Sequence, residues 1–303
     1  MTLSGPSIPN AMAEATETRL LAIDELDLHL LAGGKFGAVA DSVGQLREAT
    51  YRQQLSGSGD ERDLDGRDAH YEHLLLVERK SGLLAGAARL QFVPAGTSDL
   101  PGSDRSYLEH VYPGIKSHLA DQQNHLEIGR VALAQRFQRQ PHSLMALFRG
   151  GILLAARSGY DLLHGLVSYN HFTHSDAVNA AFLTAMMRPP YRRQGVDLPV
   201  PRHPIAGISP DDHPHPCSNI QALEQEIQRH HSEEFRLPVL LRQYFNLMEA
   251  KVCDLSLARD FNQITEILMA SNLRDLPRER LALFIDLPHQ PLYQQFSWYR
   301  GKK

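Results

Sequence analysis

One short segment constrains this chain more than any other. Residues 126–133, LEIGRVAL, place Glu127 and Arg130 inside an otherwise apolar run. The run is typical of a buried strand, where a charged side chain needs a partner or a function. Residues three apart face opposite sides of a straight strand. Gly129 lies between the two charges and predicts a bulge that would turn both side chains toward one cleft and free backbone N–H groups for a ligand.

The residues alone leave two interpretations of these charges open. Glu127 and Arg130 form either a structural ion pair or part of a functional site, because structural networks also bury charges. Arg89 poses the same question, since it follows three small residues in a second apolar run. Arg136 and Arg139 precede an expected helix, a place that suits a phosphate. That loop lacks the glycine-rich spacing of a pyrophosphate cradle, so a solvated basic turn is the alternative.

The pattern of apolar runs predicts an α+β fold. The runs 73–78 and 83–93 flank a Lys-Ser-Gly turn, which is typical of a β-hairpin. A strand at 126–133, a helix at 143–157 capped by Ser143 and a strand at 162–168 follow. This order favours a mixed, mostly antiparallel central sheet flanked by helices. We expect a further strand at 263–270, a polar connection at 94–124, and further helices at 43–55, 173–187, 223–231, 238–250 and 277–285. Residues 20–31 combine the signals of a helix and of a strand, so their structure stays undecided.

The chain of 303 residues is long enough for one large core. We expect a flexible tail at 1–18, a single domain at 19–290 and a C-terminal tail at 291–303. A His/Pro-rich insert occupies about 199–236. Its segment 211–217, DDHPHPC, could suggest a metal site, but the alternating prolines impose an extended backbone and no second ligand cluster is evident. We therefore expect no metal.

Composition narrows the location and the partners. Lys and Arg number 31 and Asp and Glu 35, so the net charge of −4 excludes broad attraction to nucleic acid. The two cysteines, Cys217 and Cys253, match no disulfide framework and suit a reducing cytoplasm. The N-terminus has no signal-peptide pattern, and the most apolar stretch, 144–154, is interrupted by Arg149 and too short to span a bilayer. Any membrane contact should be peripheral.

Four motifs occur in a suggestive order: LREATYRQQL (46–55), AHYEHLLLV (69–77), GAARLQF (86–92) and LEIGRVAL (126–133). They resemble the GNAT-fold N-acyltransferases of the ornithine-lipid type, the L-ornithine N-alpha-acyltransferases, and their hemolysin-like neighbours. Segments 161–183 and 237–269 look like later parts of that family, so the resemblance covers about 45–285. It implies a GNAT-like sheet with a C-terminal α/β extension.

The resemblance also implies an activity and a site. The family transfers a long acyl or 3-hydroxyacyl chain from acyl carrier protein to an amino-acid amine such as that of ornithine, giving a lyso-aminolipid. No permanently bound cofactor is implied, and acyl-CoA is the alternative donor. The family's functional arginine and its Glu and Arg fall on Arg89, Glu127 and Arg130. The region 199–236 is longer than the family pattern, which leaves the acceptor open.

A mechanism follows as a hypothesis. Glu127 is the expected general base for the amine, and N–H groups at the Gly129 bulge would stabilise the oxyanion. Arg130 and Arg89 would hold an acceptor carboxylate or a phosphopantetheine phosphate. The strands at 126–133 and 162–168 would splay to admit the pantetheine arm, and the helices at 143–157 and 238–250 would line an acyl tunnel. Substrate binding is expected at Arg47, Asp65, Gly129, Ser168 and Asn170, and carrier-protein or phosphopantetheine binding at Arg136 and Arg139.

Two other classes of function remain. One is an acyl-homoserine-lactone-type signal synthase or a CoA-dependent GNAT N-acetyltransferase. The other is a non-catalytic relative that binds an acyl chain or lipid. The combined presence of Arg89, Glu127 and Arg130 argues against the second. The expected location is the cytoplasm, with peripheral contact at the inner membrane through the product.

Overall fold

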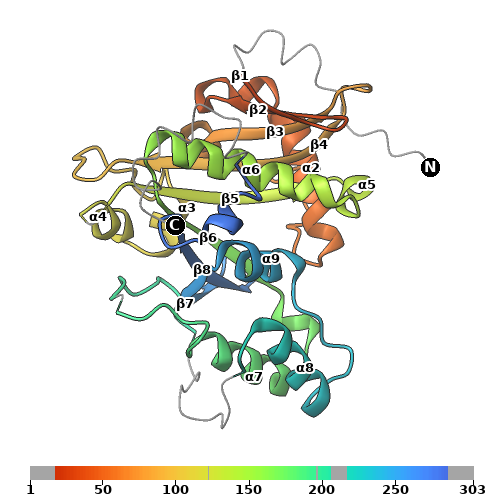
Figure 1. The fold of residues 1–303 in the computed structure, drawn as a ribbon, viewed down its shortest axis with the longest axis vertical. Helices are drawn as coiled ribbons and strands as arrows, with labels where there is room; N and C mark the ends of the chain where they lie inside the picture. Colours follow the sequence, from red (N-terminus) through yellow and green to blue (C-terminus); the bar gives the residue numbers. More distant parts are fainter. Residues whose placement is uncertain (1–17, 122, 196, 206–216, 286–303) are drawn as a thin grey trace.

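A single eight-stranded sheet runs through the described part of the molecule (Figure 1). The computed structural model describes residues 18–121, 123–195, 197–205 and 217–285. The strand order is β1-β2-β3-β4-β5-β6-β8-β7, and neighbours are antiparallel except for the parallel pair of β5 and β6. The strands are β1 (Thr18–Ile23), β2 (Leu26–Leu31), β3 (Glu72–Glu78), β4 (Leu84–Val93), β5 (His125–Leu133), β6 (Leu162–Tyr169), β7 (Lys251–Ala258) and β8 (Ile264–Asn272).

This sheet confirms the predicted fold class and the predicted β3–β4 hairpin. The undecided region 20–31 forms a second hairpin, β1 and β2, next to it. Strand β7 was not expected. Its sequence, KVCDLSLA, carries polar residues in an edge strand that pairs with β8 on one side and makes isolated bridges through Val252 and Ser256 on the other. Strands β7 and β8 bring the expected C-terminal extension into the same sheet.

Helices cover both faces of the sheet. On one face, α6 (Pro141–Ser158) lies across the strands β1 to β5, and its apolar side packs on residues such as Leu74, Leu76 and Leu90 (Figure 1). On the other face, α2 (Ala40–Gln53) packs on Leu75 and Ala87. The alternation of Leu74, Leu75 and Leu76 between the two cores is the period of two expected of a strand buried on both sides.

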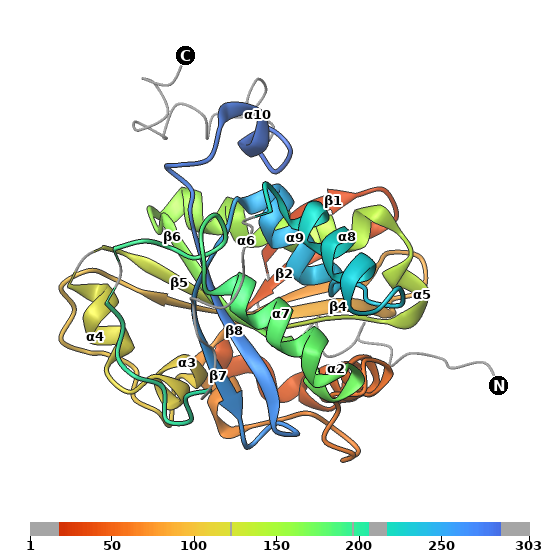
Figure 2. The same ribbon diagram turned by 90° about the horizontal axis from the view of Figure 1, so that it is seen from below.

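The helices α7 (Asp176–Met186), α8 (Ile220–His230) and α9 (Val239–Met248) lie beside the C-terminal strands, and α10 (Arg278–Leu281) follows β8 (Figure 2). The other short helices are α5 (Gln135–Gln138) and the 3-10 helices η1 (Gly33–Ala38), η2 (Gly66–His70) and η3 (His171–Thr173). Helix α6 ends at Gly159, whose φ of 75° gives the left-handed C-cap that favours glycine. It begins at Pro141, so Ser143 lies inside the first turn and does not cap it.

The prediction that residues 94–124 form a polar connection is wrong in one respect. It contains two short helices, α3 (Tyr107–Val111) and α4 (Ile115–Ala120). Their apolar side chains form a separate core with Leu162 of β6 and Leu268 of β8. The apolar residues of this segment are spaced by helical periods among polar ones, which hides them from a search for continuous apolar runs.

The expected boundaries of the tails and of the domain stay predictions. Residues 1–17 and 286–303 lie outside the described residues, and so do 206–216 of the His/Pro-rich insert. Thr18, the last residue of the expected N-terminal tail, already belongs to β1.

Candidate functional site

The parallel pair of β5 and β6 separates after three residues. The paired positions are His125 with Leu162, Leu126 with Leu163, and Glu127 with His164. At the next residue, Gly165, a Cβ atom would lie 2.3 Å from the carbonyl oxygen of Ile128. Only glycine fits this close approach of two backbones. Beyond it, a cleft with a volume of about 640 Å³ lies beside the diverging strands and is lined by Glu127, Ser168 and Glu266.

The bulge in β5 lies one residue beyond the predicted position. Gly129 pairs in register with Arg89, and the register shifts between this pair and that of Ala87 with Ala132. Arg130 takes the left-handed conformation, with a φ of 51°. A non-glycine residue in this region is uncommon and is often found at functional sites. The distortion brings the side chains of Glu127 and Arg130 to the same cleft, as expected from their spacing.

Glu127 is held by four donors. The phenol of Tyr71 donates to its Oε1 at 2.6 Å, the hydroxyl of Ser106 donates to Oε2 at 2.8 Å, and the backbone N–H of Leu108 lies 3.3 Å from Oε1. The ammonium of Lys116 forms an ion pair with Oε2 at 2.6 Å. Burial by itself would raise the pKa of Glu127, but the charge of Lys116 and these hydrogen bonds lower it below the ordinary value. The carboxylate is therefore stabilised as an anion.

A network of three arginines and three aspartates lies beside Glu127. Arg89 contacts Asp68 at 3.0 Å and stacks its guanidinium on Tyr71, 4.3 Å from the ring centre. Arg130 pairs with Asp63 at 3.2 Å and with Asp65 at 3.4 Å. Burial opposes ionisation of Asp68, yet Arg47 and Arg89 lower its pKa to about 2. Buried charges paired in this way hold one another in fixed geometry.

The expected substrate-binding residues occupy different places. Ser168, Asn170 and Gly129 line the cleft. Arg47 is fully buried, donates to Asp68 at 2.9 Å and is absent from the cleft lining, so its position is a supporting one. Asp65 accepts from the N–H of Arg67 at 2.8 Å as the N-cap of η2 and faces Arg89 and Arg130.

The two expected carrier-binding arginines are also separated. Arg139 is exposed and lines the cleft. Arg136 instead pairs with Glu78 of β3 and stacks on Phe137. A further exposed arginine at the cleft, Arg236, was missed by the sequence analysis, because it lies in the His/Pro-rich region that carried no motif.

Glu266 of β8 is a further site residue that was not predicted from the sequence. This carboxyl group lines the same cleft, is 3% exposed and accepts a hydrogen bond from the phenol of Tyr107 at 2.9 Å through Oε1. Burial raises its pKa to about 7, although the hydrogen bond from Tyr107 and the charge of Arg130 act in the opposite direction. The signal was present in the sequence, since Glu266 stands in the apolar run ITEILMA much as Glu127 stands in LEIGRVAL.

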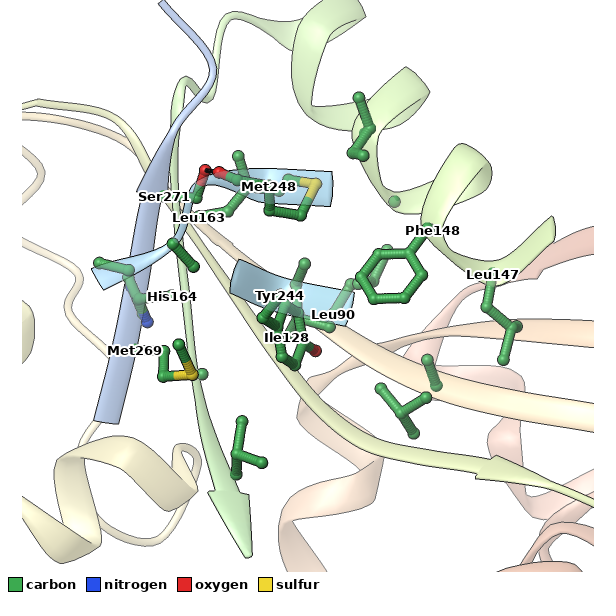
Figure 3. Close-up of a pocket in the computed structure, with 18 of the residues that line it drawn as sticks. Leu90, Ile128, Leu147, Phe148, Leu163, His164, Tyr244, Met248, Met269 and Ser271 are labelled. Carbon is green, nitrogen blue, oxygen red and sulfur yellow. Dashed lines mark hydrogen bonds between the residues drawn. The ribbon is translucent and has the colours of Figure 1, made fainter. Parts of the chain in front are cut away.

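An apolar cavity adjoins the cleft. It is lined by residues of the two helices expected to form an acyl tunnel, including Leu147, Phe148 and Gly151 of α6 and Tyr244 and Met248 of α9. Figure 3 shows Phe148 and Tyr244 pointing into the space that Ile128 of β5 also reaches. Their rings meet edge to face, 5.3 Å apart. The cavity has a volume of about 50 Å³ and borders the cleft. The two share several lining residues, which are Ile128, Val131, Leu144, Gly165, Val167 and Tyr244.

Two features are absent from the described residues. Within the described ranges, no group of three His, Cys, Asp or Glu side chains is arranged to hold a metal ion. Most of the candidate segment 211–217 lies outside those ranges. The helices that the structure describes include none that is long and apolar enough to cross a bilayer.

Comparison with known proteins gives one family match and several distant structural likenesses. Residues 46–148 match the family model described as an acetyltransferase (GNAT) domain. The match runs from α2 into α6 and includes Arg89, Glu127 and Arg130, but not Ser168 or Glu266. A search of the curated proteins gives no significant match.

The likenesses among solved structures are distant. FeeM, an N-acyl amino acid synthase from uncultured soil microbes, is 12% identical over 86% of this chain and 92% of its own, with a TM-score of 0.41. BjaI, a CoA-dependent acyl-homoserine lactone synthase, is 12% identical over 86% of this chain and 89% of its own, with a TM-score of 0.40. The acetyltransferase-like yncA of Salmonella typhimurium is 13% identical over 83% of this chain and 96% of its own, with a TM-score of 0.35. At such scores they carry no argument about substrate.

The family match and the sheet agree with each other. The mixed sheet, the parallel β5–β6 pair that separates and the flanking helices make the fold GNAT-like, as the resemblance implied. The match of residues 46–148 to an acetyltransferase (GNAT) domain model supports an acyltransferase.

Proposed function

We propose that this chain transfers a long acyl or 3-hydroxyacyl chain from a carrier thioester to the amine of an amino acid such as ornithine, which gives a lyso-aminolipid. One observation carries the proposal: a cleft lined by charged side chains adjoins an apolar cavity at the point where β5 and β6 separate. A substrate with a polar head and an apolar tail fits such a space. A chain that transferred acetyl groups alone would not need the apolar part.

The apolar cavity is the proposed site of the acyl chain. Burying a methylene group stabilises a complex by about 0.8 kcal/mol, so a lined apolar space selects for chain length. The thioester carbonyl would lie near the bulge at residues 129–131 of β5. Backbone N–H groups there are the proposed donors to the tetrahedral oxyanion.

Arginines are the proposed contacts for the anionic groups of the substrates, which are the acceptor carboxylate and the phosphopantetheine phosphate. Arg130 lines the cleft and is the proposed partner of the acceptor carboxylate, with Arg89 behind it in the aspartate network. The exposed Arg139 and Arg236 lie at the same cleft and would bind the phosphate of a phosphopantetheine arm. Acyl carrier protein is the proposed donor partner and acyl-CoA its alternative. The amphiphilic product suggests a cytoplasmic protein in peripheral contact with the inner membrane.

Glu127 was expected to be the general base, and its contacts support another role. A general base needs an accessible lone pair and a pKa near the working pH. The oxygens of Glu127 accept from Tyr71, Ser106 and Lys116, and its pKa is lowered. Its contacts suit a structural anion that holds α3 and Lys116 against β5.

The test is a purified-enzyme assay with a panel of substrates. Wild-type protein would be incubated with acyl carrier protein thioesters and with acyl-CoA of several lengths. Acceptors would include ornithine, other amino acids and S-adenosylmethionine, the last to test the signal-synthase alternative. Thiol release and mass spectrometry of the product identify donor and acceptor. Binding of the acyl thioester without thiol release on any acceptor would favour a non-catalytic relative.

The apolar cavity can be tested by filling it. Gly151 lines it, and the nearest atom to an added Cβ would be Ile128 Cδ1 at an ordinary 3.8 Å. We expect Gly151→Leu to shorten the preferred acyl chain by about two to four carbons, with Gly151→Ala intermediate. Each methylene group of the substrate that no longer fits in the cavity loses about 0.8 kcal/mol of binding free energy. The control is Gly37→Leu, at an exposed glycine with open space around it. An unchanged length profile in Gly151→Leu would place the acyl chain elsewhere.

A further inference from the structure

The second carboxyl group of the cleft differs from the first in having a free oxygen. Glu266 accepts from Tyr107 through Oε1, whereas its Oε2 is buried and has no hydrogen-bond partner among the described residues. Buried polar atoms are rarely left in this state unless a ligand or a function uses them. Because Glu266 lines the cleft, a cleft-bound molecule is the available partner for this oxygen.

The position of Glu266 in the sheet is fixed on both sides. It lies opposite Ser168 of β6 and opposite Ser256 of β7 in two antiparallel ladders. Directly opposed side chains share a face of the sheet. Ser168 is exposed and lines the cleft, so Glu266 is directed to the face of the sheet on which the cleft lies. It therefore lies beside the splayed strands, where the amine and the thioester would meet.

Positively and negatively charged side chains, together with tyrosines, surround Glu266. Tyr107 of α3 hydrogen-bonds to it, and Tyr112 follows the same helix. Asp260 follows β7, lies within 3.4 Å of the Tyr107 phenol and pairs with His110 at 3.4 Å. Arg130 of β5 stacks over Tyr107 at 5.5 Å and forms ion pairs with Asp63 and Asp65, and its charge acts to lower the pKa of Glu266. The structure shows no ion pair between Glu266 and a cation in the described part of the chain.

We propose that Glu266 is the general base of the acyl transfer and removes a proton from the ammonium group of the acceptor. The inference rests on the proposed function and names the residue that performs its first step. The unpartnered Oε2 takes one proton from the ammonium, which leaves a neutral amine. Tyr107, bonded to Oε1, holds the carboxyl group in place.

The remaining steps balance in protons and electrons. The amine lone pair forms the C–N bond at the thioester carbonyl, and the tetrahedral intermediate collapses with cleavage of the C–S bond. The thiolate leaves with the bonding pair and takes the second proton from the nitrogen, giving a free thiol and an amide. The proton held by Glu266 returns to solvent before the next turnover. No oxidant, metal or covalent enzyme intermediate is needed.

The protonation behaviour of the two carboxyl groups agrees with this assignment. Burial, which raises the pKa of Glu266 to about 7, places it where a general base works best near neutral pH. The pKa of Glu127 is lowered, so that group would return a proton too readily to draw one from an ammonium ion.

The experiment compares pH profiles of matched variants, Glu266→Gln, Glu266→Asp and Glu127→Gln. We expect Glu266→Gln to lower kcat/KM by about 10²- to 10⁴-fold at pH 7 and to lose the inflection near that pH. At high pH, where free amine is already present, the deficit should shrink. Glu266→Asp should keep the inflection at a reduced rate. The control is Glu72→Gln, since Glu72 is another partly buried glutamate whose pKa burial raises but which does not line the cleft.

A second measurement does not depend on turnover. Infrared titration of the folded protein should show a carboxyl group that ionises near pH 7 in wild type and is missing in Glu266→Gln. Equal pH profiles of wild type and Glu266→Gln would overturn the inference and leave the acyl transfer standing. Loss of the inflection in Glu127→Gln alone would return the role to Glu127. A wild-type protein that releases no thiol with any donor and acceptor would overturn the proposed function, and this inference with it.

Discussion

Two buried glutamates face one cleft, and their surroundings are opposite. Glu127 has four donors, one of them a buried lysine, while Glu266 has one phenol and an oxygen without a partner among the described residues. Both are almost fully buried, with 4% and 3% exposure. The pKa of Glu127 is lowered and that of Glu266 is raised to about 7. Burial alone therefore does not decide the pKa of these two carboxyl groups; the charge of Lys116 and the hydrogen-bond donors around Glu127 account for the difference.

Tyr107 connects the two groups. Its backbone N–H donates to the hydroxyl of Tyr71, which itself donates to Glu127, and its phenol donates to Glu266. Helix α3 is thus fixed to β5 at its first turn and covers Glu266 with its first side chain. The rigid anion positions the element that shields the proposed base.

The largest expected effect separates the two glutamates by stability. Glu127→Ala leaves Lys116 buried without its anion, and we expect a loss of about 3–5 kcal/mol in the free energy of unfolding. Glu266→Gln breaks no ion pair and should not lower that free energy at pH 7, because the neutral amide avoids burying a carboxylate charge. Urea denaturation followed by circular dichroism measures both. Comparable losses would contradict the division into a structural and a proton-moving carboxyl group.

The next effect is a dependence of stability on pH. The pKa of Glu266 is raised from 4.5 to about 7, so between these values the folded protein binds a proton that the unfolded chain has lost. Stability from this group is therefore full below pH 4.5 and falls by about 3 kcal/mol as pH rises to 7. Comparing urea midpoints at pH 5 and pH 8 should show this fall in wild type and its absence in Glu266→Gln. Glu127, with its lowered pKa, contributes stability that is lost toward acid instead.

The smallest expected effect compares two tyrosines. Tyr107→Phe removes the hydrogen bond that lowers the pKa of Glu266, so the acidic limb of the kcat/KM profile should move up by less than about one pH unit. Tyr71→Phe leaves that limb in place and should cost about 1–3 kcal/mol of stability, because it removes a donor to Glu127 and the acceptor of the Tyr107 N–H. If both variants moved the limb equally, the two carboxyl groups would be titrating as one unit.

Much of the β-sheet and part of the site could be predicted from local pattern. The β3–β4 hairpin, strand β5 and the helix α6 follow from apolar runs, a turn and a glycine stop. The sequence pattern predicts the bulge at Gly129, whereas the residue that adopts the left-handed conformation is Arg130. The edge strand β7 was missed because polar side chains interrupt its apolar pattern.

The sequence by itself determined the period of the strands, the charged residues they carry and the order in which β3, β4, β5 and β6 are joined. These depend on neighbours along the chain. Only the tertiary structure decided which charge has a partner, because Lys116 and Ser106 reach Glu127 from a segment that looked like a polar connection. In the same way β8 pairs with β6 from about a hundred residues away and brings Glu266 to the cleft. A side chain's pKa and its chemistry depend on groups close in space, and the fold alone brings those groups together.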